Sequence, residues 1–208
     1  MSLSNETLEG TPAGFFRGPI ECVEIRPDDV RCVEKTEFLR NSDVPFKVGD
    51  TFSYEFAGSA KDTDIYTVEG IERINGSDCF VVRREYSFTG PSDTIHTTER
   101  VWYDKDTGRI KKDELSESDI LYGEVAESLS SDTLFFAQWM LSLTDDFKLE
   151  IRYNDTYATA GVLSYEVVGR EKIDGRNCFK VKVNDRYLWV DAEKRILIKS
   201  STGEQLVA

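Results

Sequence analysis

Apolar and polar residues alternate along most of this 208-residue chain. Residues 178–183 show the pattern clearly, because Phe179, Val181 and Val183 share one face of an extended chain, while the residues between them, two of which are lysines, share the other. Such alternation predicts antiparallel strands with one covered face. The strands expected on this basis are residues 46–56, 65–73, 79–86, 94–103, 109–113, 147–153, 163–173, 178–183, 186–190 and 196–200.

Part of this pattern occurs twice. Residues 66–82 read YTVEGIERINGSDCFVV and residues 165–181 read YEVVGREKIDGRNCFKV, with 9 of 17 positions identical at an offset of 99. The match resumes at an offset of 87, where VWYDKDTGRI (101–110) answers LWVDAEKRI (188–196). Each copy has Asn-Gly or Asp-Gly at its centre, which is a strong hairpin signal. The sequence therefore predicts a repeated strand–turn–strand unit.

The segment between the two copies has a different period. Ser130, Ser131 and Asp132 are good helix N-cap residues, and the following run LFFAQWMLSL (134–143) has a narrow polar stripe formed by Gln138 and Ser142. A surface helix has a wider polar face. We therefore predict a helix over 131–143 that is covered on most sides, either in the mouth of a curved sheet or against a ligand or partner.

The predicted fold is α+β and mostly β: a curved antiparallel sheet built from two repeated strand units with a helix between them. An N-terminal arm with a cysteine hairpin (1–40) precedes a single repeat-built domain (41–208). In that domain we expect a first unit (46–112), a helical insert (113–145) and a second unit (147–200). The pattern leaves open whether the two units share one sheet.

The charge of the chain excludes some partners. The formal net charge is -13, so a nucleic-acid backbone would be repelled and no nucleic-acid partner is expected. No run of about 18 apolar residues is present, and association with a membrane would require an anchor outside the present sequence.

The cysteines suggest an oxidising compartment. In the segment ECVEIRPDDVRC, a turn at residues 27–29 places Cys22 opposite Cys32, where a disulfide is geometrically plausible and would contribute about 2–3 kcal/mol. Cys79 and Cys178 occupy equivalent positions of the repeat and either face each other or are buried thiols. Three N-x-[ST] sequons, at Asn5, Asn75 and Asn154, agree with a protein outside the cytoplasm.

Four aromatic residues are the candidate ligand-binding residues. Trp102 and Trp189 are out of phase with their apolar neighbours and share a face with polar residues, while Phe135 and Trp139 belong to the predicted helix. All four could line one apolar groove. The alternatives are that the two tryptophans pack beneath the helix and that Phe135 and Trp139 are ordinary core. His96 is the only histidine, and we expect no metal site, no cofactor and no catalytic residues.

The motif Y-x-V-x-G-x-E-x-I-[ND]-G-x-x-C-F-x-V, followed in both copies by W-x-D, resembles secreted or lipid-anchored archaeal proteins. These are similar to the bacterial lipoprotein-sorting carriers of the LolA/LolB type. The resemblance implies a half-barrel whose concave side is covered by helices. In the sorting carriers, this hollow holds acyl chains. We therefore expect an extracytoplasmic, non-catalytic binding protein for a lipid or other apolar ligand. The alternative is a cell-surface or envelope protein-interaction module with a filled core and no small ligand.

Overall fold

The computed structural model describes the backbone of residues 15–16, 20–26, 29–34, 42–56, 61–90, 94–114, 135–154 and 160–207. Side chains are described for residues 42–56, 62–90, 94–112, 114, 135–150 and 162–207.

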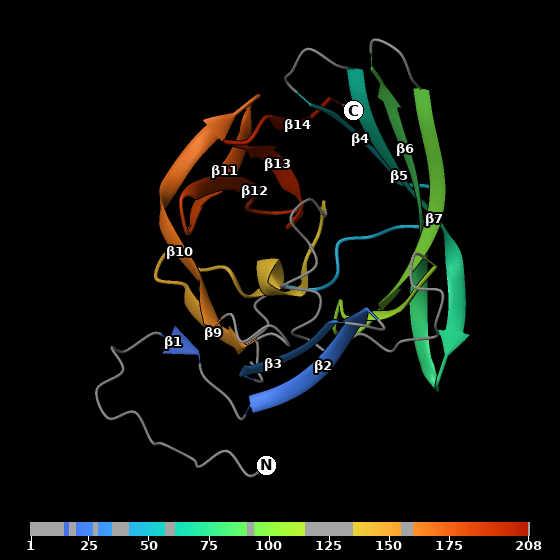
Figure 1. Ribbon diagram of the computed structural model, residues 1–208. Helices are drawn as coiled ribbons and strands as arrows, with labels where there is room; N and C mark the ends of the chain where they lie inside the picture. The colour runs from blue at the N-terminus through green and yellow to red at the C-terminus, as the bar shows by residue number, and fades with distance from the viewer. Residues whose placement is uncertain are drawn as a thin grey trace.

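The described residues form one open, curved β-sheet, as the alternating pattern predicts (Figure 1). Its strands are β1 (Phe15–Phe16), β2 (Ile20–Arg26), β3 (Asp29–Glu34), β4 (Thr51–Phe56), β5 (Lys61–Ile74), β6 (Ser77–Thr89), β7 (Thr94–Asp104), β8 (Ile110–Asp113), β9 (Lys148–Asn154), β10 (Ala160–Ile173), β11 (Arg176–Val183), β12 (Arg186–Asp191), β13 (Leu197–Ser200) and β14 (Glu204–Leu206). The strand order is β2-β3-β9-β10-β11-β12-β13-β14-β4-β5-β6-β7-β8. These pairs are antiparallel, and β1 pairs in parallel with β9.

The two predicted strand units share this single sheet. The short strand β14 joins them, because Gln205 pairs with Lys199 of β13 on one side and with Glu55 of β4 on the other. The sheet curves around residues 135–143, which lie at the centre of Figure 1. We call the side of the sheet that faces this segment the concave face; it carries the main hydrophobic core, to which both units contribute.

Both units have the same local features at the same sequence offset. The β5–β6 ladder has a register shift between Val68 and Gly70, and the β10–β11 ladder has one between Val167 and Gly169. The turns that follow, Asn75-Gly76 and Asp174-Gly175, have positive φ at both residues, as a two-residue hairpin turn requires.

The predicted helix over 131–143 is wrong. Residues 131–134 lie outside the described part of the chain, and only Gln138–Ser142 form a helix, which is a single 3₁₀ turn (η1). Its N-cap residue, Ala137, has an extended backbone and no side-chain cap. The prediction that this segment is covered on most sides is confirmed for its described part, because every residue from 135 to 143 is buried.

The N-terminal hairpin has the predicted register. Strands β2 and β3 pair with Cys22 opposite Cys32, and a register shift lies between Glu24 and Arg26. Cys32 also pairs with Asn154 of β9, so the hairpin extends the common sheet. The side chains of Cys22 and Cys32 lie outside the described set, and the disulfide between them stays a prediction.

Candidate functional site

A charged row crosses the concave face of the first unit. Four strands contribute to it, because Phe52 of β4 pairs with Tyr66 of β5, Tyr66 with Arg84 of β6, and Arg84 with Glu99 of β7. Asp64 lies two residues before Tyr66 and therefore on the same face. The next row on this face, formed by Val68, Val82 and Val101, is apolar and belongs to the core.

Asp64, Arg84 and Glu99 form what we call the ionic cluster. Arg84 donates from Nε to Asp64 Oδ1 and from Nη2 to Asp64 Oδ2, both at 2.8 Å, so the pair is bidentate. Its Nη1 donates to Glu99 Oε1 at 2.9 Å. One guanidinium thus donates to both carboxylates of the cluster.

The two carboxylates of the ionic cluster are nearly inaccessible to water, whereas the Arg84 side chain is 19% exposed. Asp64 is only 1% exposed and Glu99 only 6% exposed. Burial by itself would lower the pKa of Arg84, but the hydrogen bonds to Asp64 and Glu99 raise it above its ordinary value, so the guanidinium stays charged. Burial raises the pKa of Tyr66 well above its usual range, the Arg84 charge opposes this, and the Tyr66 hydroxyl remains a donor to Asp64 Oδ2 at 3.4 Å.

The second unit has different residues at the same places. At an offset of 99, Leu163 stands where the first unit has Asp64, and Val183 stands where it has Arg84. The registers agree, since Tyr66 pairs with Arg84 and Tyr165 pairs with Val183. The fold therefore accommodates apolar side chains at these positions.

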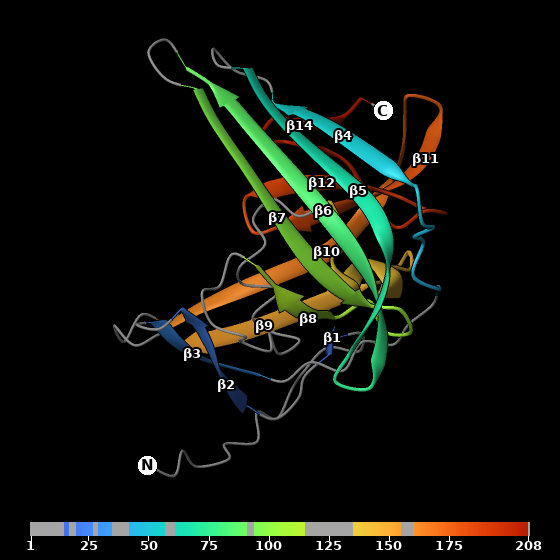
Figure 2. The same ribbon diagram turned by 90° about the vertical axis from the view of Figure 1, so that its right-hand side faces the viewer.

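The first unit also has a longer hairpin above the ionic cluster. Strands β6 and β7 have 13 and 11 residues, whereas β11 and β12 have 8 and 6. Figure 2 shows β6 and β7 extending beyond the body of the molecule. Because strand side chains alternate between the two faces of a sheet, every second side chain of this extension lies on the concave side.

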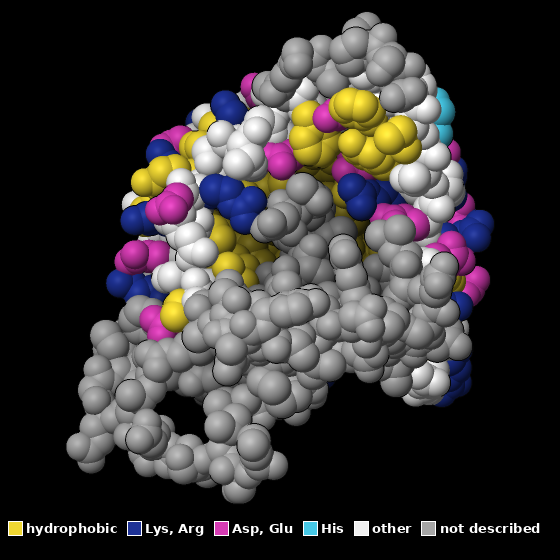
Figure 3. All heavy atoms as spheres, in the orientation of Figure 1, with side chains coloured by type: hydrophobic (Ala, Val, Ile, Leu, Met, Phe, Trp, Pro, Cys, Tyr) yellow, Lys and Arg dark blue, Asp and Glu magenta, His cyan; other side chains and the backbone are white. Residues whose placement is uncertain are grey.

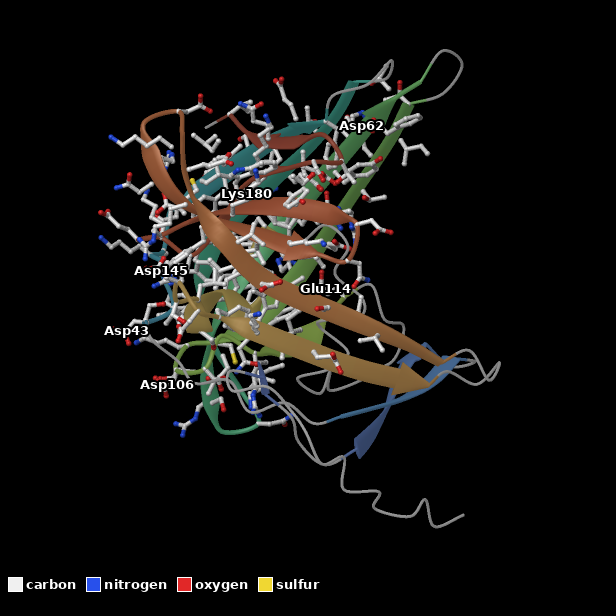
Figure 4. All side chains as sticks on the ribbon, turned by 90° about the vertical axis from the view of Figure 1, so that its left-hand side faces the viewer. Asp43, Asp62, Asp106, Glu114, Asp145 and Lys180 are labelled. Carbon is white, nitrogen blue, oxygen red and sulfur yellow. The ribbon has the colours of Figure 1, made fainter. Side chains whose placement is uncertain are left out.

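The extension and its neighbours present aromatic and acidic side chains together. By alternation from the buried core residues, Phe56, Asp62, Tyr86 and Phe88 lie on the concave side above the ionic cluster; we call these four the upper concave face. Figure 3 shows hydrophobic side chains gathered beside acidic ones in the upper part of the molecule, and Figure 4 places Asp62 near the upper end of the sheet. Asp62 Oδ1 is buried, with no hydrogen-bond partner in the part of the chain that the structure describes.

Burial and charge act together on Tyr86. Burial raises the pKa of its hydroxyl, and the nearby carboxylates of Asp62 and Asp64 add to this. The Arg84 guanidinium carbon lies 5.7 Å from the Tyr86 ring centroid. The upper concave face can thus offer an apolar wall, a phenol donor and carboxylate acceptors to a bound molecule.

Two of the four candidate ligand-binding residues belong to the main core. Phe135 is tilted against Tyr66 at 4.4 Å and stacks on Phe52 at 5.2 Å, both distances between ring centroids. Trp139 packs on the other half of the sheet, with its ring 5.0 Å from that of Tyr165. These residues fill the lower part of the concave face with the protein's own side chains.

The two other candidates lie on the opposite side of the sheet. Trp102 packs with Cys79 and Val81 in a small separate cluster, and its Nε1 donates to Glu72 Oε2 at 2.9 Å. In the second unit, Trp189 Nε1 donates to Glu171 Oε2 at 2.8 Å, and the Lys180 ammonium lies 5.4 Å from its ring. Figure 4 shows Lys180 on the outer side of the sheet.

The four aromatic residues are therefore not brought together into one groove. The reason is the alternation of the strands: Val101 and Val190 face the core, so the adjacent Trp102 and Trp189 face outward. The alternative that both tryptophans pack beneath residues 131–143 is also wrong for Trp102, whose cluster is separate from the main core.

Cys79 and Cys178 are buried thiols and are not bonded to each other. Burial raises the pKa of Cys178 to about 11 and also raises the pKa of Cys79, so both are protonated near neutral pH. No group of three or more metal-ligand side chains occurs among the described residues.

The comparisons with known proteins add nothing to this picture: no family model, no curated protein and no solved structure matches the chain. Within the ranges that the structure describes, no helix is long and apolar enough to cross a membrane.

Sequence reasoning missed the ionic cluster, although a signal was present. Asp64 and Arg84 break the apolar positions of their strands, and in the aligned second unit those positions are Leu163 and Val183. A comparison of the two copies for their differences, in addition to their identities, would have found both residues.

Proposed function

We propose that this protein is a non-catalytic binding protein that acts outside the cytoplasm and holds a lipid or other apolar ligand on its upper concave face. The apolar part of the ligand lies against Phe56, Tyr86 and Phe88. Its polar end meets Asp62 and the ionic cluster below. Because Asp62 and the cluster offer carboxylate oxygens as acceptors, the polar end carries hydrogen-bond donors.

The observation that carries this proposal is the ionic cluster itself. Buried ion pairs contribute little to stability, and well-packed apolar residues in their place are often neutral or stabilising by about 1–4 kcal/mol. The second unit has Leu163 and Val183 at the corresponding positions. Departures from the locally most stable choice concentrate at functional sites, which favours a binding role for Asp64 and Arg84.

The proposal includes a finer description of the fold, as a duplicated half-barrel of the LolA/LolB type. The paired register shifts and paired hairpin turns of the two units support a duplication. In the carriers, the hollow of the half-barrel takes acyl chains. Here residues 135–143 occupy the lower part of the concave face, so the ligand takes the upper part.

A location outside the cytoplasm, with secretion or a lipid anchor, belongs to the same proposal. Its support is the register of β2 and β3, which puts Cys22 opposite Cys32. Directly opposed positions in antiparallel strands lie within the distance range that a disulfide spans. Mass measurement with and without reduction and alkylation tests the bridge, because the oxidised form would leave only Cys79 and Cys178 to be alkylated after unfolding.

Native mass spectrometry before and after organic extraction tests the binding proposal. We expect a lipid-sized adduct that disappears on extraction and returns when the extract is added back. The double variant Tyr86→Ala/Phe88→Ala should retain at least tenfold less adduct, since each lost ring removes more than 1 kcal/mol of apolar burial. Tyr187→Ala, a matched variant of a half-buried ring, should retain the adduct as the unaltered protein does.

One observation favours a second candidate, an envelope interaction module with a filled core. All residues from 135 to 143 are buried, and they pack against both halves of the sheet. In that case extraction leaves the mass unchanged, and added lipids do not alter it. The same spectra therefore distinguish the two functions.

A further inference from the structure

At one edge of the sheet, some strand residues have no strand beside them within the part of the chain that the structure describes. Strand β7 pairs with β6 along its whole length, but on its other side only Val101, Trp102 and Tyr103 pair with β8. Residues 94–98 are all exposed, and no described residue pairs with their outer side. Figure 2 shows this upper part of β7 at the margin of the sheet.

The backbone groups on this edge can be assigned a direction. The Glu114 N–H donates to the Arg100 carbonyl at 3.0 Å from the β8 side, so the polar groups of Arg100 point away from β6. Successive residues of an antiparallel strand point alternately to its two neighbours. The N–H and C=O groups of Thr94, His96 and Thr98 therefore also point away from β6.

The edge also lacks the features that normally prevent an exposed strand from pairing with a strand of another chain. Exposed edges are usually blunted by lysine, proline, a bulge or inward-facing charge. Residues 94–98 read TIHTT, in a chain of which 31% is charged, and four of these five residues are β-branched strand formers. The ladder between β6 and β7 runs through this stretch without a register shift.

We propose that a second copy of this chain pairs with the β7 edge to form a two-fold symmetric dimer with a continuous sheet. The two-fold axis passes through His96, so that Thr94 of one copy lies opposite Thr98 of the other. In this register, every residue with outward-pointing backbone groups meets another such residue. All three outward N–H groups of each copy then donate to carbonyls of the other copy.

The absence of charged side chains from residues 94–98 favours self-association at this edge. Two copies that each have a net charge of -13 repel one another, and the contact must avoid placing like charges together. The proposed register places only threonine, isoleucine and histidine opposite each other. On the outer face, the nearest charged side chains of β6 are Glu85 and Arg83, which pair with each other at 2.6 Å.

The dimer is weak. A contact over five residues buries less than the roughly 1,200 Å² of a stable interface, so we expect dissociation constants of about 10–1,000 µM. Added salt screens the repulsion between the copies and should strengthen the contact. The edge adjoins the proposed ligand site, since Ile95 pairs with Phe88 and Thr97 pairs with Tyr86, but the proposed contact is made by backbone groups and requires no bound ligand.

Sedimentation velocity over about 5 µM to 1 mM protein tests the dimer, with two matched variants. Ile95 and Ile71 are both exposed strand isoleucines, at 49% and 46%, but only Ile95 is on the open edge, since Ile71 pairs with Phe80 in the interior of the sheet. The unaltered protein and Ile71→Lys should associate alike with concentration. Ile95→Lys should remain a monomer, or associate at least tenfold more weakly.

A second variant tests the pairing of the backbone directly. Thr98→Pro removes one outward N–H in each copy and leaves the hydrogen bonds to β6 in place, so circular dichroism should remain unchanged while association weakens at least tenfold. The inference is overturned if the unaltered protein stays monomeric at 1 mM. It is also overturned if Ile95→Lys or a folded Thr98→Pro associates as strongly as Ile71→Lys.

Discussion

Single residues at corresponding turns show how the sheet is packed against the 135–143 segment. Gly108 follows β7 with φ +75°, a conformation that side chains rarely adopt. In the second unit, Arg195 stands at the offset of 87 with φ +55° and uses its side chain instead, because Nη1 donates to the Leu143 carbonyl at 3.0 Å. The two turns thus pack against the same segment by different means.

Gly108→Ala should destabilise the protein by about 2–4 kcal/mol. An added Cβ would lie 3.0 Å from Leu141 Cδ1 and 3.0 Å from Phe136 Cζ, so strain from overpacking adds to the backbone cost. Gly76→Ala is the control, with φ +87° and no atom within 4 Å of the added Cβ, and should lose only about 1 kcal/mol. Urea unfolding measures both changes, and equal losses would show that the contact with the segment is unimportant.

At the scale of elements, variants of the ionic cluster should change the stability of the fold and the binding of the ligand independently. The variant Arg84→Val removes the guanidinium that two buried carboxylates share and should lose about 3–5 kcal/mol. The triple variant Asp64→Leu/Arg84→Val/Glu99→Gln removes all charges and should be as stable as the unaltered protein, or more stable. Denaturant unfolding measures both variants.

The same triple variant gives a second readout. In native mass spectra it should lose the extractable adduct although its fold is intact, because the polar end of the ligand has lost its partners. A stable triple variant that keeps the adduct would contradict the proposed role of the cluster. A triple variant as unstable as Arg84→Val would show that the cluster is structural.

The strands could be predicted from the sequence, and the helix could not be excluded. Period-2 alternation is local information, so the strands between residues 46 and 200 were predicted, with ends wrong by up to five residues, as at the start of β4, whereas β14 was not predicted. A continuous apolar run such as 134–143 has no such signature, since a buried helix and a buried extended segment look alike. The backbone conformation of this run is determined by contacts with distant parts of the chain. The Phe135 ring packs against Phe52 and Tyr66, and the Leu197 N–H donates to the Phe135 carbonyl at 2.7 Å.

At the scale of the whole molecule, closure of the two units into one sheet depends on a strand of three residues. Strand β14 lies at positions 204–206, and its segment has too few residues to show a period. Its partner β4 begins about 150 residues earlier in the chain. Pairing over such a separation is not encoded in any local pattern, and for this reason the sequence left open whether the units share one sheet.

Gln205→Pro should loosen this connection. The Val207 N–H donates to the Ser53 carbonyl at 2.8 Å, so by alternation the Gln205 N–H also points toward β4, and proline removes it. We expect a loss of about 2 kcal/mol and faster hydrogen exchange in β4 than in β10 or β11. Gln205→Ala loses the same side-chain contact with Asp174 but keeps the N–H, and should change stability by less than about 0.5 kcal/mol. If proline and alanine have the same effect, the two halves are held together by the core around residues 135–143 and not by β14.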